Sequence, residues 1–131
     1  MNTDPISDFL TRIRNASRAG LARCAAPHSN QKLGIARILK ADGYIADFSE
    51  GADANRHKTI VVHLKYVGGQ PAINGLNRTS KPGRRIYTSA SDIPKVLNGL
   101  GGNVLSTSHG LMSGAMARRK NLGGEIICNV W

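Results

Sequence analysis

One segment says more than any other about the fold and the function: Gly102-Asn103-Val104-Leu105-Ser106-Thr107-Ser108-His109-Gly110-Leu111-Met112. Its aliphatic beginning predicts a strand over residues 103–106, and the three consecutive hydroxyl side chains before Gly110 predict a tight turn. Small hydroxyl groups on a tight turn can approach phosphates, ribose hydroxyls and base edges closely. An ordinary Ser/Thr turn has the same composition, so this segment by itself leaves both interpretations open.

The remainder of the C-terminal half is predicted to consist of short elements separated by Gly, Pro and Ser clusters. Capping residues and apolar alternation give their positions. The expected elements are two paired strands over 72–79 and 84–88 around the turn Ser80-Lys81-Pro82-Gly83, a short helix from Asp92 through Leu97, a weak helix capped by Ser113 and ending at 118–120, and a last strand over 125–131.

The N-terminal half has a more regular pattern, which predicts the order α-β-α-β-β. Asp4 and Pro5 predict the start of a helix, and Gly20 its end. Ser29 and Gly43 bound a second helix in the same way. The apolar positions expected to face a core are Ile6, Phe9, Leu10 and Ile13 in the first helix, Tyr44, Ala46 and Phe48 in one strand, and Ile60, Val62, Leu64 and Tyr66 in another.

A Gly/Pro cluster over 67–71 separates the two halves and is the best candidate for a boundary. The predicted fold class is therefore α+β with two small packed lobes. Residues 1–66 form an N-terminal α-β-α-β-β lobe in this prediction. Residues 67–131 form a C-terminal lobe of mostly short antiparallel strands with short helices.

The charge of the chain favours a polyanionic partner. Its 131 residues include 18 Lys and Arg against 8 Asp and Glu, a formal net charge of +10. Between Asp53 and Asp92 there is no carboxylate, although seven Lys and Arg residues lie there. A surface with so few compensating acids repels itself unless a polyanion such as nucleic acid neutralises it. A basic protein whose lysines and arginines only keep it soluble is the alternative.

Other classes of protein find little support. The longest aliphatic run, Ile60–Val62, is far too short to span a bilayer, and the first residues resemble no secretory signal, so we expect a cytoplasmic protein. Cys24 and Cys128 are then expected to be reduced, buried thiols. The cysteines and the scattered histidines lack metal-ligand spacing, and Ser108-His109 are adjacent without a nearby carboxylate. We therefore expect no catalysis, no metal and no cofactor.

Blocks along the whole chain resemble the bacterial small-subunit ribosomal protein S8 family. The signature lies in Gly101–Arg118, with Ser106-Thr107-Ser108, Gly110-Leu111-Met112 and Ala117-Arg118 as its elements. The further matching blocks are Thr3–Ile6, Leu10–Ala16, Gly43–Ile45, Leu64–Tyr66, Ser80–Gly83, Val96–Gly101 and Gly123–Ile126. Two departures stand out: Ser113-Gly114-Ala115-Met116 where the family has a charged helix start, and Asn129 where an aromatic residue is common. The glycine is expected to weaken the helix there.

The resemblance implies a structural protein that binds the central domain of 16S rRNA early in assembly, with small-subunit ribosomal proteins five and twelve as neighbours. It also implies that the hydroxyl turn enters the irregular core of an RNA helix. The RNA-binding residues carried over are Ser106, Thr107, Ser108, Lys81, Pro82, Tyr87, Gly124 and Glu125, with Thr3, Arg14 and Asn15 as less secure matches. Some family members repress their own messenger, which the sequence does not decide. A small RNA-modifying or hydrolytic enzyme and a DNA-binding regulator are the competing interpretations.

Overall fold

A computed structural model describes residues 4–131, which fall into two compact units. One unit is Ile6–Asn74; the other is Gly75–Trp131 together with Asp4 and Pro5. Three α-helices and antiparallel sheets are present among the described residues, which confirms the α+β class. The lobe boundary between residues 66 and 67 stays a prediction.

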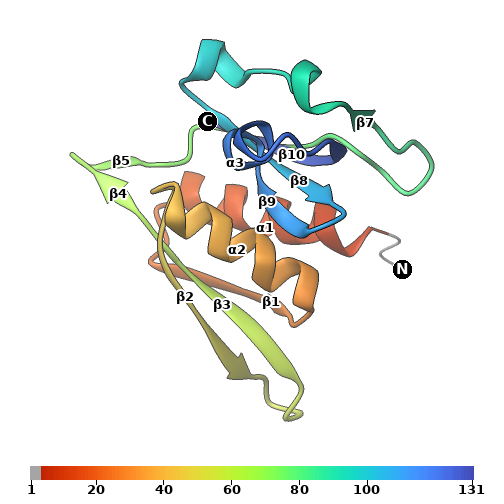
Figure 1. The fold of residues 1–131 in the computed structure, drawn as a ribbon. Helices are drawn as coiled ribbons and strands as arrows, with labels where there is room; N and C mark the ends of the chain where they lie inside the picture. The colour runs from red at the N-terminus through yellow and green to blue at the C-terminus, as the bar shows by residue number, and fades with distance from the viewer. Residues whose placement is uncertain (1–3) are drawn as a thin grey trace. The chain divides into compact units, whose positions relative to one another are not determined.

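The Ile6–Asn74 unit is built around a three-stranded antiparallel sheet of order β1-β3-β2 (Figure 1). Its elements are α1 (Pro5–Arg18), β1 (Arg23–Pro27), α2 (Asn30–Ala41), β2 (Ile45–Ala52) and β3 (Lys58–Leu64), followed by the small hairpin of β4 (Tyr66–Val67) and β5 (Gln70–Pro71). The predicted order α-β-α-β-β is confirmed, and the Gly/Pro cluster forms the β4–β5 hairpin.

Local sequence explains why these helices begin and end where they do. The predicted apolar stripe of α1 is buried, and Gly20 after it has φ +73°. The Ser29 hydroxyl accepts a hydrogen bond from the Lys32 backbone N–H at 3.2 Å and caps α2, while Gly43 beyond its end has φ +82°. Helix α2 packs on β2 and β3, where Ile60, Val62 and Leu64 are buried.

The expected alternation in β2 is wrong at Ala46. Ile45 is opposite Leu64 and is buried, whereas Asp47 is opposite His63, so Ala46 is an extra residue in a β-bulge. A bulge shifts the pleat by one residue and changes which side chains face the core. Ala46 is consequently exposed, and Ile45 takes the core position in its place.

The Gly75–Trp131 unit contains a sheet of order β6-β10-β8-β9. Its strands are β6 (Leu76–Arg78), β7 (Tyr87–Thr88), β8 (Gly102–Thr107), β9 (Gly110–Ser113) and β10 (Gly124–Val130), and α3 spans Gly114–Arg119. The strands predicted over 103–106 and 125–131 are confirmed to within a residue. The Ser113 hydroxyl accepts from the Met116 N–H at 3.2 Å, which confirms the predicted cap of α3.

The predicted pairing of 72–79 with 84–88 is wrong, because both segments pair with β10. Strand β6 lies opposite Cys128–Val130, and β7 lies opposite Gly124 and Glu125. The chain between them forms a loop anchored by Ser80, which is fully buried. The Ser80 hydroxyl accepts a hydrogen bond from the Ile86 N–H at 2.8 Å. This bond gives the Ile86 N–H the partner that a neighbouring strand would have given it in the predicted hairpin.

The predicted helix from Asp92 through Leu97 is also wrong. A short 3₁₀ turn over Ala90–Asp92 and an irregular turn over Val96–Gly99, in which Leu97 and Asn98 have positive φ, flank an extended segment instead. Side chains take the carbonyls of that segment: Arg118 Nη2 donates to Ile93 O, and Asn103 Nδ2 donates to Pro94 O, each at 2.9 Å. The extended backbone also lets Ile93 reach the core.

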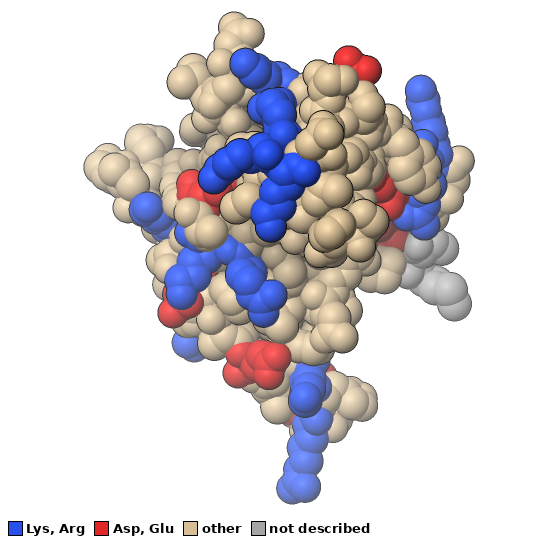
Figure 2. Space-filling model, in the orientation of Figure 1, with Lys and Arg blue, Asp and Glu red and all other residues tan. Residues whose placement is uncertain are grey.

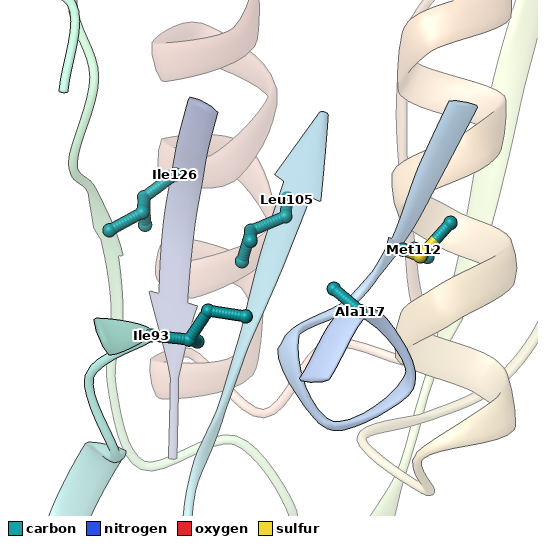
Figure 3. Packing of buried hydrophobic residues seen from close by; sticks show 5 residues of the cluster. All are labelled: Ile93, Leu105, Met112, Ala117 and Ile126. Atoms are coloured by element: carbon teal, nitrogen blue, oxygen red, sulfur yellow. The ribbon is translucent and has the colours of Figure 1, made fainter. Parts of the chain in front are cut away.

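The core beside α3 is small and aliphatic (Figure 3). Its residues are Ile93 from the segment before β8, Leu105 from β8, Met112 from β9, Ala117 from α3 and Ile126 from β10. Gly114 lies so close to Asn103 that a Cβ at this position would overlap the Asn103 side chain. The glycine expected to weaken α3 is thus accommodated at its first position. No helix within residues 4–131 is long and apolar enough to cross a membrane.

Candidate nucleic-acid interface

The hydroxyl turn is the tip of the β8–β9 hairpin. Thr107 pairs with Gly110, and Ser108 and His109 form the connection. The Thr107 hydroxyl donates to Gly110 O at 2.8 Å and accepts from the His109 N–H at 3.1 Å, while Gly110 has φ +103°. Thr107 therefore shapes the turn from inside.

The neighbouring hydroxyls are differently placed. Ser108 is exposed and Ser106 is half-buried, and neither hydroxyl makes a hydrogen bond within residues 4–131. A hydroxyl group can donate one hydrogen bond and accept two. Ser106 and Ser108 thus keep their full hydrogen-bonding capacity for a ligand.

A row of side chains crosses four strands beside this turn. Tyr87 lies opposite Glu125, Glu125 lies opposite Ser106, and Ser106 lies opposite Leu111. Directly opposed residues of antiparallel strands project from the same face. We call Tyr87, Glu125, Ser106 and Leu111 the recognition row; it places an aromatic ring that is 70% exposed, a carboxylate, a hydroxyl and an aliphatic group side by side.

Gly124 permits the close approach of β10 to β8 at this row. A Cβ on Gly124 would lie 2.1 Å from the carbonyl oxygen of Ser106. The obstacle is backbone, which cannot move aside as a flexible side chain could. The absence of a side chain at Gly124 thereby lets Ser106 and Glu125 lie side by side.

The Lys-Pro turn forms a separate basic loop next to β7. Lys81 and Arg84 exchange two backbone hydrogen bonds of 2.9 Å, and their side chains are exposed together with Pro82. Arg85 Nη1 donates to Glu125 Oε2 at 3.1 Å and joins this loop to the recognition row. The loop presents cations beside the polar groups of the row.

Not all of the predicted residues belong to the Gly75–Trp131 unit. Arg14 is half-buried and Asn15 is exposed on α1, which is in the Ile6–Asn74 unit. Thr3 lies outside the described residues. The other eight predicted residues lie in the hairpin tip, the recognition row, its Gly124 support and the basic loop.

Arg85 and Leu111 are part of this arrangement and were not predicted. Arg85 lies two residues before Tyr87, so strand alternation could have placed both on one face. Leu111 could have been found only from the β8–β9 register. Figure 2 shows further Lys and Arg side chains gathered where α3 lies in Figure 1; Arg118, Arg119 and Lys120 at the end of α3 are all exposed.

The described residues contain no group of three or more His, Cys, Asp or Glu side chains that could hold a metal ion. The arrangement instead offers hydrogen bonds, one aromatic face and positive charge. These are the groups with which proteins contact irregular or single-stranded RNA.

The two cysteines are free, as expected, but only Cys128 is fully buried; Cys24 is half-buried in β1. Burial raises the pKa of Cys128 to about 12. Burial also raises the pKa of Cys24, against the opposing effect of the Arg12 charge. Raised pKa values keep both thiols protonated at neutral pH.

Iodoacetamide is therefore expected to leave Cys128 unmodified in the folded protein at pH 7.5, because the thiolate is the reactive form. Cys24 should react slowly and Cys128 only after unfolding in guanidinium chloride. Mass spectrometry of peptides at timed intervals measures both rates, with the unfolded protein as control. Modification of Cys128 as fast as Cys24 would contradict the burial of the former.

A basic α+β protein with hydroxyl, aromatic and carboxylate groups beside a cationic loop has the features of an RNA-binding protein. Its similarity to known proteins places it among the ribosomal proteins, which are not enzymes. The chain belongs to the ribosomal protein S8 family, whose profile matches residues 4–131. This confirms the resemblance seen in the sequence.

Individual relatives match over their full length. The small ribosomal subunit protein uS8 of Opitutus terrae is 62% identical over 129 residues, which covers 98% of this chain and 99% of that protein. The protein of the same name from Streptococcus mutans is 52% identical over 130 residues, covering 98% of each chain. That of Oleidesulfovibrio alaskensis is 50% identical over 131 residues, covering all of both chains.

Proposed function

We propose that this protein is a structural constituent of the small ribosomal subunit in the cytoplasm, where it binds the central domain of 16S rRNA as a primary binding protein and helps that domain assemble. The recognition row beside the hydroxyl turn is the observation that carries this proposal. Family membership supports the ribosomal part, since the relatives are named as small ribosomal subunit proteins.

The row and the turn suit an irregular RNA helix. A regular A-form helix hides its base edges in a deep, narrow major groove, so specific proteins contact bulges and unstacked bases. Ser106 and Ser108 can bond to ribose hydroxyls and base edges, and Tyr87 can stack on an unpaired base. Glu125 can accept from a ribose hydroxyl or a base amino group, while Arg85 offsets its charge beside phosphates.

The basic side chains give affinity rather than specificity in this proposal. Lys81 and Arg84 of the loop and the basic end of α3 would neutralise phosphates and release counterions. We also infer that residues 67–131 are the rRNA-binding lobe and that small-subunit ribosomal proteins five and twelve are neighbours. Arg14 and Asn15, and Thr3 beyond the described residues, would add contacts from the N-terminal segment.

Lys81→Ala is expected to weaken binding to a cognate RNA hairpin and to a regular duplex alike. One lost phosphate contact should reduce the slope of log K against log salt by roughly one unit. Filter binding at several salt concentrations measures this slope. Lys95→Ala removes the same charge from an exposed position outside the loop and is the matched control. Equal slopes for the two variants would contradict a phosphate contact by Lys81.

Competition between nucleic acids tests the proposed function. A hairpin with the irregular helix of the central domain should compete with labelled small-subunit rRNA far better than a fully paired RNA of equal length. Duplex DNA should resemble the paired RNA. Equal competition by all three would reject specific rRNA binding, and preference for duplex DNA would favour a DNA-binding regulator. Release of cleaved or modified RNA would favour an enzyme.

A further inference from the structure

The Ile6–Asn74 unit has a hollowed sheet face that the recognition row does not involve. Strand alternation turns Ala26, Ile60 and Val62 toward the core, so that Ala25, Thr59, Val61 and their neighbours point the other way. Across the three strands, Ala25 is opposite Val61 and Val61 is opposite Ser49; one step along, Pro27, Thr59 and Gly51 are aligned. We call this outward face the sheet groove.

The groove consists of two adjoining hollows of about 490 and 530 Å³. Ala25, Asp53 and Thr59 line both hollows, so the two share a border on this face. The floor of the groove is made of small side chains, and its lining includes the imidazoles of His57 and His63 but no Phe, Tyr or Trp. A floor of this kind allows a polar chain to lie close to the sheet.

Cationic side chains surround the groove. Arg12, Arg23 and Lys58 line it together with His57 and His63. Figure 2 shows basic side chains at the end of the β2–β3 hairpin, at the bottom of the view. Arg23 and Lys58 make no side-chain hydrogen bond or ion pair within residues 4–131. Their charges are therefore available to a ligand.

The carboxylates near the groove are already engaged. Asp53 Oδ1 accepts from the backbone N–H groups of Asn55 and His57, both at 2.9 Å, and so holds the β2–β3 turn. Asp47, opposite His63, is paired with Lys40 at 2.9 Å. Arg12 is held by Asp8 and by Ala25 O, each at 2.9 Å, at the β1 edge of the groove. The groove thus has a positive rim. Its floor bears the hydroxyl of Thr59, which can donate a hydrogen bond, and the hydroxyl of Ser49, which lies 3.3 Å from His63 Nε2 in a hydrogen bond.

We propose that the sheet groove binds the sugar–phosphate backbone of a second rRNA segment, separate from the one that the hydroxyl turn recognises. Phosphate contacts by Arg, Lys and hydroxyl groups fix position without reading sequence, which suits a groove that offers the free cations of Arg23 and Lys58 and the hydroxyl of Thr59. The inference rests on the proposed function, because it takes rRNA as the partner. An acidic protein segment is negatively charged, as RNA is, and could also bind this groove. The test must therefore distinguish an RNA ligand from a protein ligand.

Paired charge removal tests the groove. Arg23→Gln with Lys58→Gln removes the two free cations, and Arg37→Gln with Lys65→Gln removes the same charge from exposed positions outside the groove. Binding is measured on naked small-subunit rRNA and on the isolated irregular hairpin, at several salt concentrations, after circular dichroism shows that both variants are folded.

On the long rRNA, the groove variant should lower the salt slope by about 1.4–1.8 units and the affinity at 0.1 M salt by roughly 25- to 60-fold relative to wild type, with a much smaller change in the control. On the isolated hairpin, the two double variants should behave alike. Since naked rRNA carries no protein, equal affinities of the two variants for the long rRNA would overturn the inference and leave a protein ligand for the groove. A groove variant that weakens hairpin binding as much as long-rRNA binding would also overturn it.

Failure of the proposed function gives a different result. In that case the wild-type protein would not prefer the irregular hairpin to a paired duplex, whatever the groove variant does. A second measurement locates the contact: hydroxyl radicals generated from a reagent tethered at Thr59→Cys, with Cys24→Ser to remove the native thiol, should cut one rRNA segment. The same reagent tethered at Ser108→Cys should cut another. If the reagent at residue 59 cuts the same rRNA segment as the reagent at residue 108, the proposal of a second segment is overturned. It is also overturned if the reagent at residue 59 cuts no more than a reagent tethered at Arg37→Cys.

Discussion

Gly124→Ala is expected to destabilise the protein by about 1–3 kcal/mol and to remove its preference for the irregular RNA hairpin. The added methyl group would lie 2.1 Å from Ser106 O and 3.1 Å from the Thr107 Cα, both backbone atoms of β8. The two strands must separate to admit it, which moves Ser106 and Glu125 apart at the centre of the recognition row.

Urea unfolding followed by circular dichroism measures the change in stability, and hairpin-against-duplex competition measures the loss of preference. Gly83→Ala is the matched control, because a Cβ at Gly83 meets no atom within 4 Å and its φ is not positive. Equal free energies of unfolding for the two variants would show that β8 and β10 tolerate a side chain at Gly124. That result would remove the structural reason for a glycine there.

Ser108→Ala is expected to leave stability unchanged and to weaken binding to the cognate hairpin by about 5- to 150-fold. Ser108 is exposed and without a hydrogen-bond partner in the described part of the chain, so its loss affects only a ligand. An unsatisfied partner in the RNA interface corresponds to ~1–3 kcal/mol. Net charge is unaltered, so binding to a fully paired duplex should change little.

Thr107→Ala should act differently from Ser108→Ala, because the Thr107 hydroxyl makes two hydrogen bonds inside the turn. We expect it to weaken hairpin binding and also to lower the free energy of unfolding by roughly 0.5–1.5 kcal/mol for a lost bond. Thr107→Ser keeps the hydroxyl and should recover most of both losses. Equal weakening on hairpin and duplex by the Ser108 and Thr107 variants would show that the turn does not recognise RNA shape.

The parts of the fold that local sequence determines could be predicted. Helix α1 follows from a single apolar stripe between Pro5 and Gly20, and the Ser29 cap of α2 and the Ser113 cap of α3 depend only on residues three positions away. The strand β8 and the turn after it follow from aliphatic residues that change abruptly to hydroxyls. None of these needs knowledge of a distant partner.

The errors arise where a distant segment decides. Ala46 is displaced by a bulge that depends on how β2 aligns with β3, and a one-residue shift in register changes every later side chain. The strands β6 and β7 pair with β10, which lies 50 to 54 residues beyond β6 and 36 to 38 residues beyond β7, rather than with each other. Alternation within a strand shows that it is a strand but does not identify its neighbour.

The same limit applies to the candidate site. Ser106, Tyr87 and Glu125 could be named from the family resemblance, but their alignment depends on the register of β10 against two other strands. The partnership of Arg85 with Glu125 spans forty positions in the chain and leaves no local signal. The difference between Thr107, which is used inside the turn, and Ser108, which is free, also requires the structure.

Chemical footprinting of the free protein on naked small-subunit rRNA tests most directly whether shape recognition, rather than charge, brings this protein to RNA. Wild-type protein should protect one irregular helix of the central domain most strongly, and Ser108→Ala should weaken that protection while keeping any separate contact of the sheet groove. Uniform protection along the rRNA, unchanged by Ser108→Ala, would contradict specific recognition and leave only the +10 charge as the basis of binding.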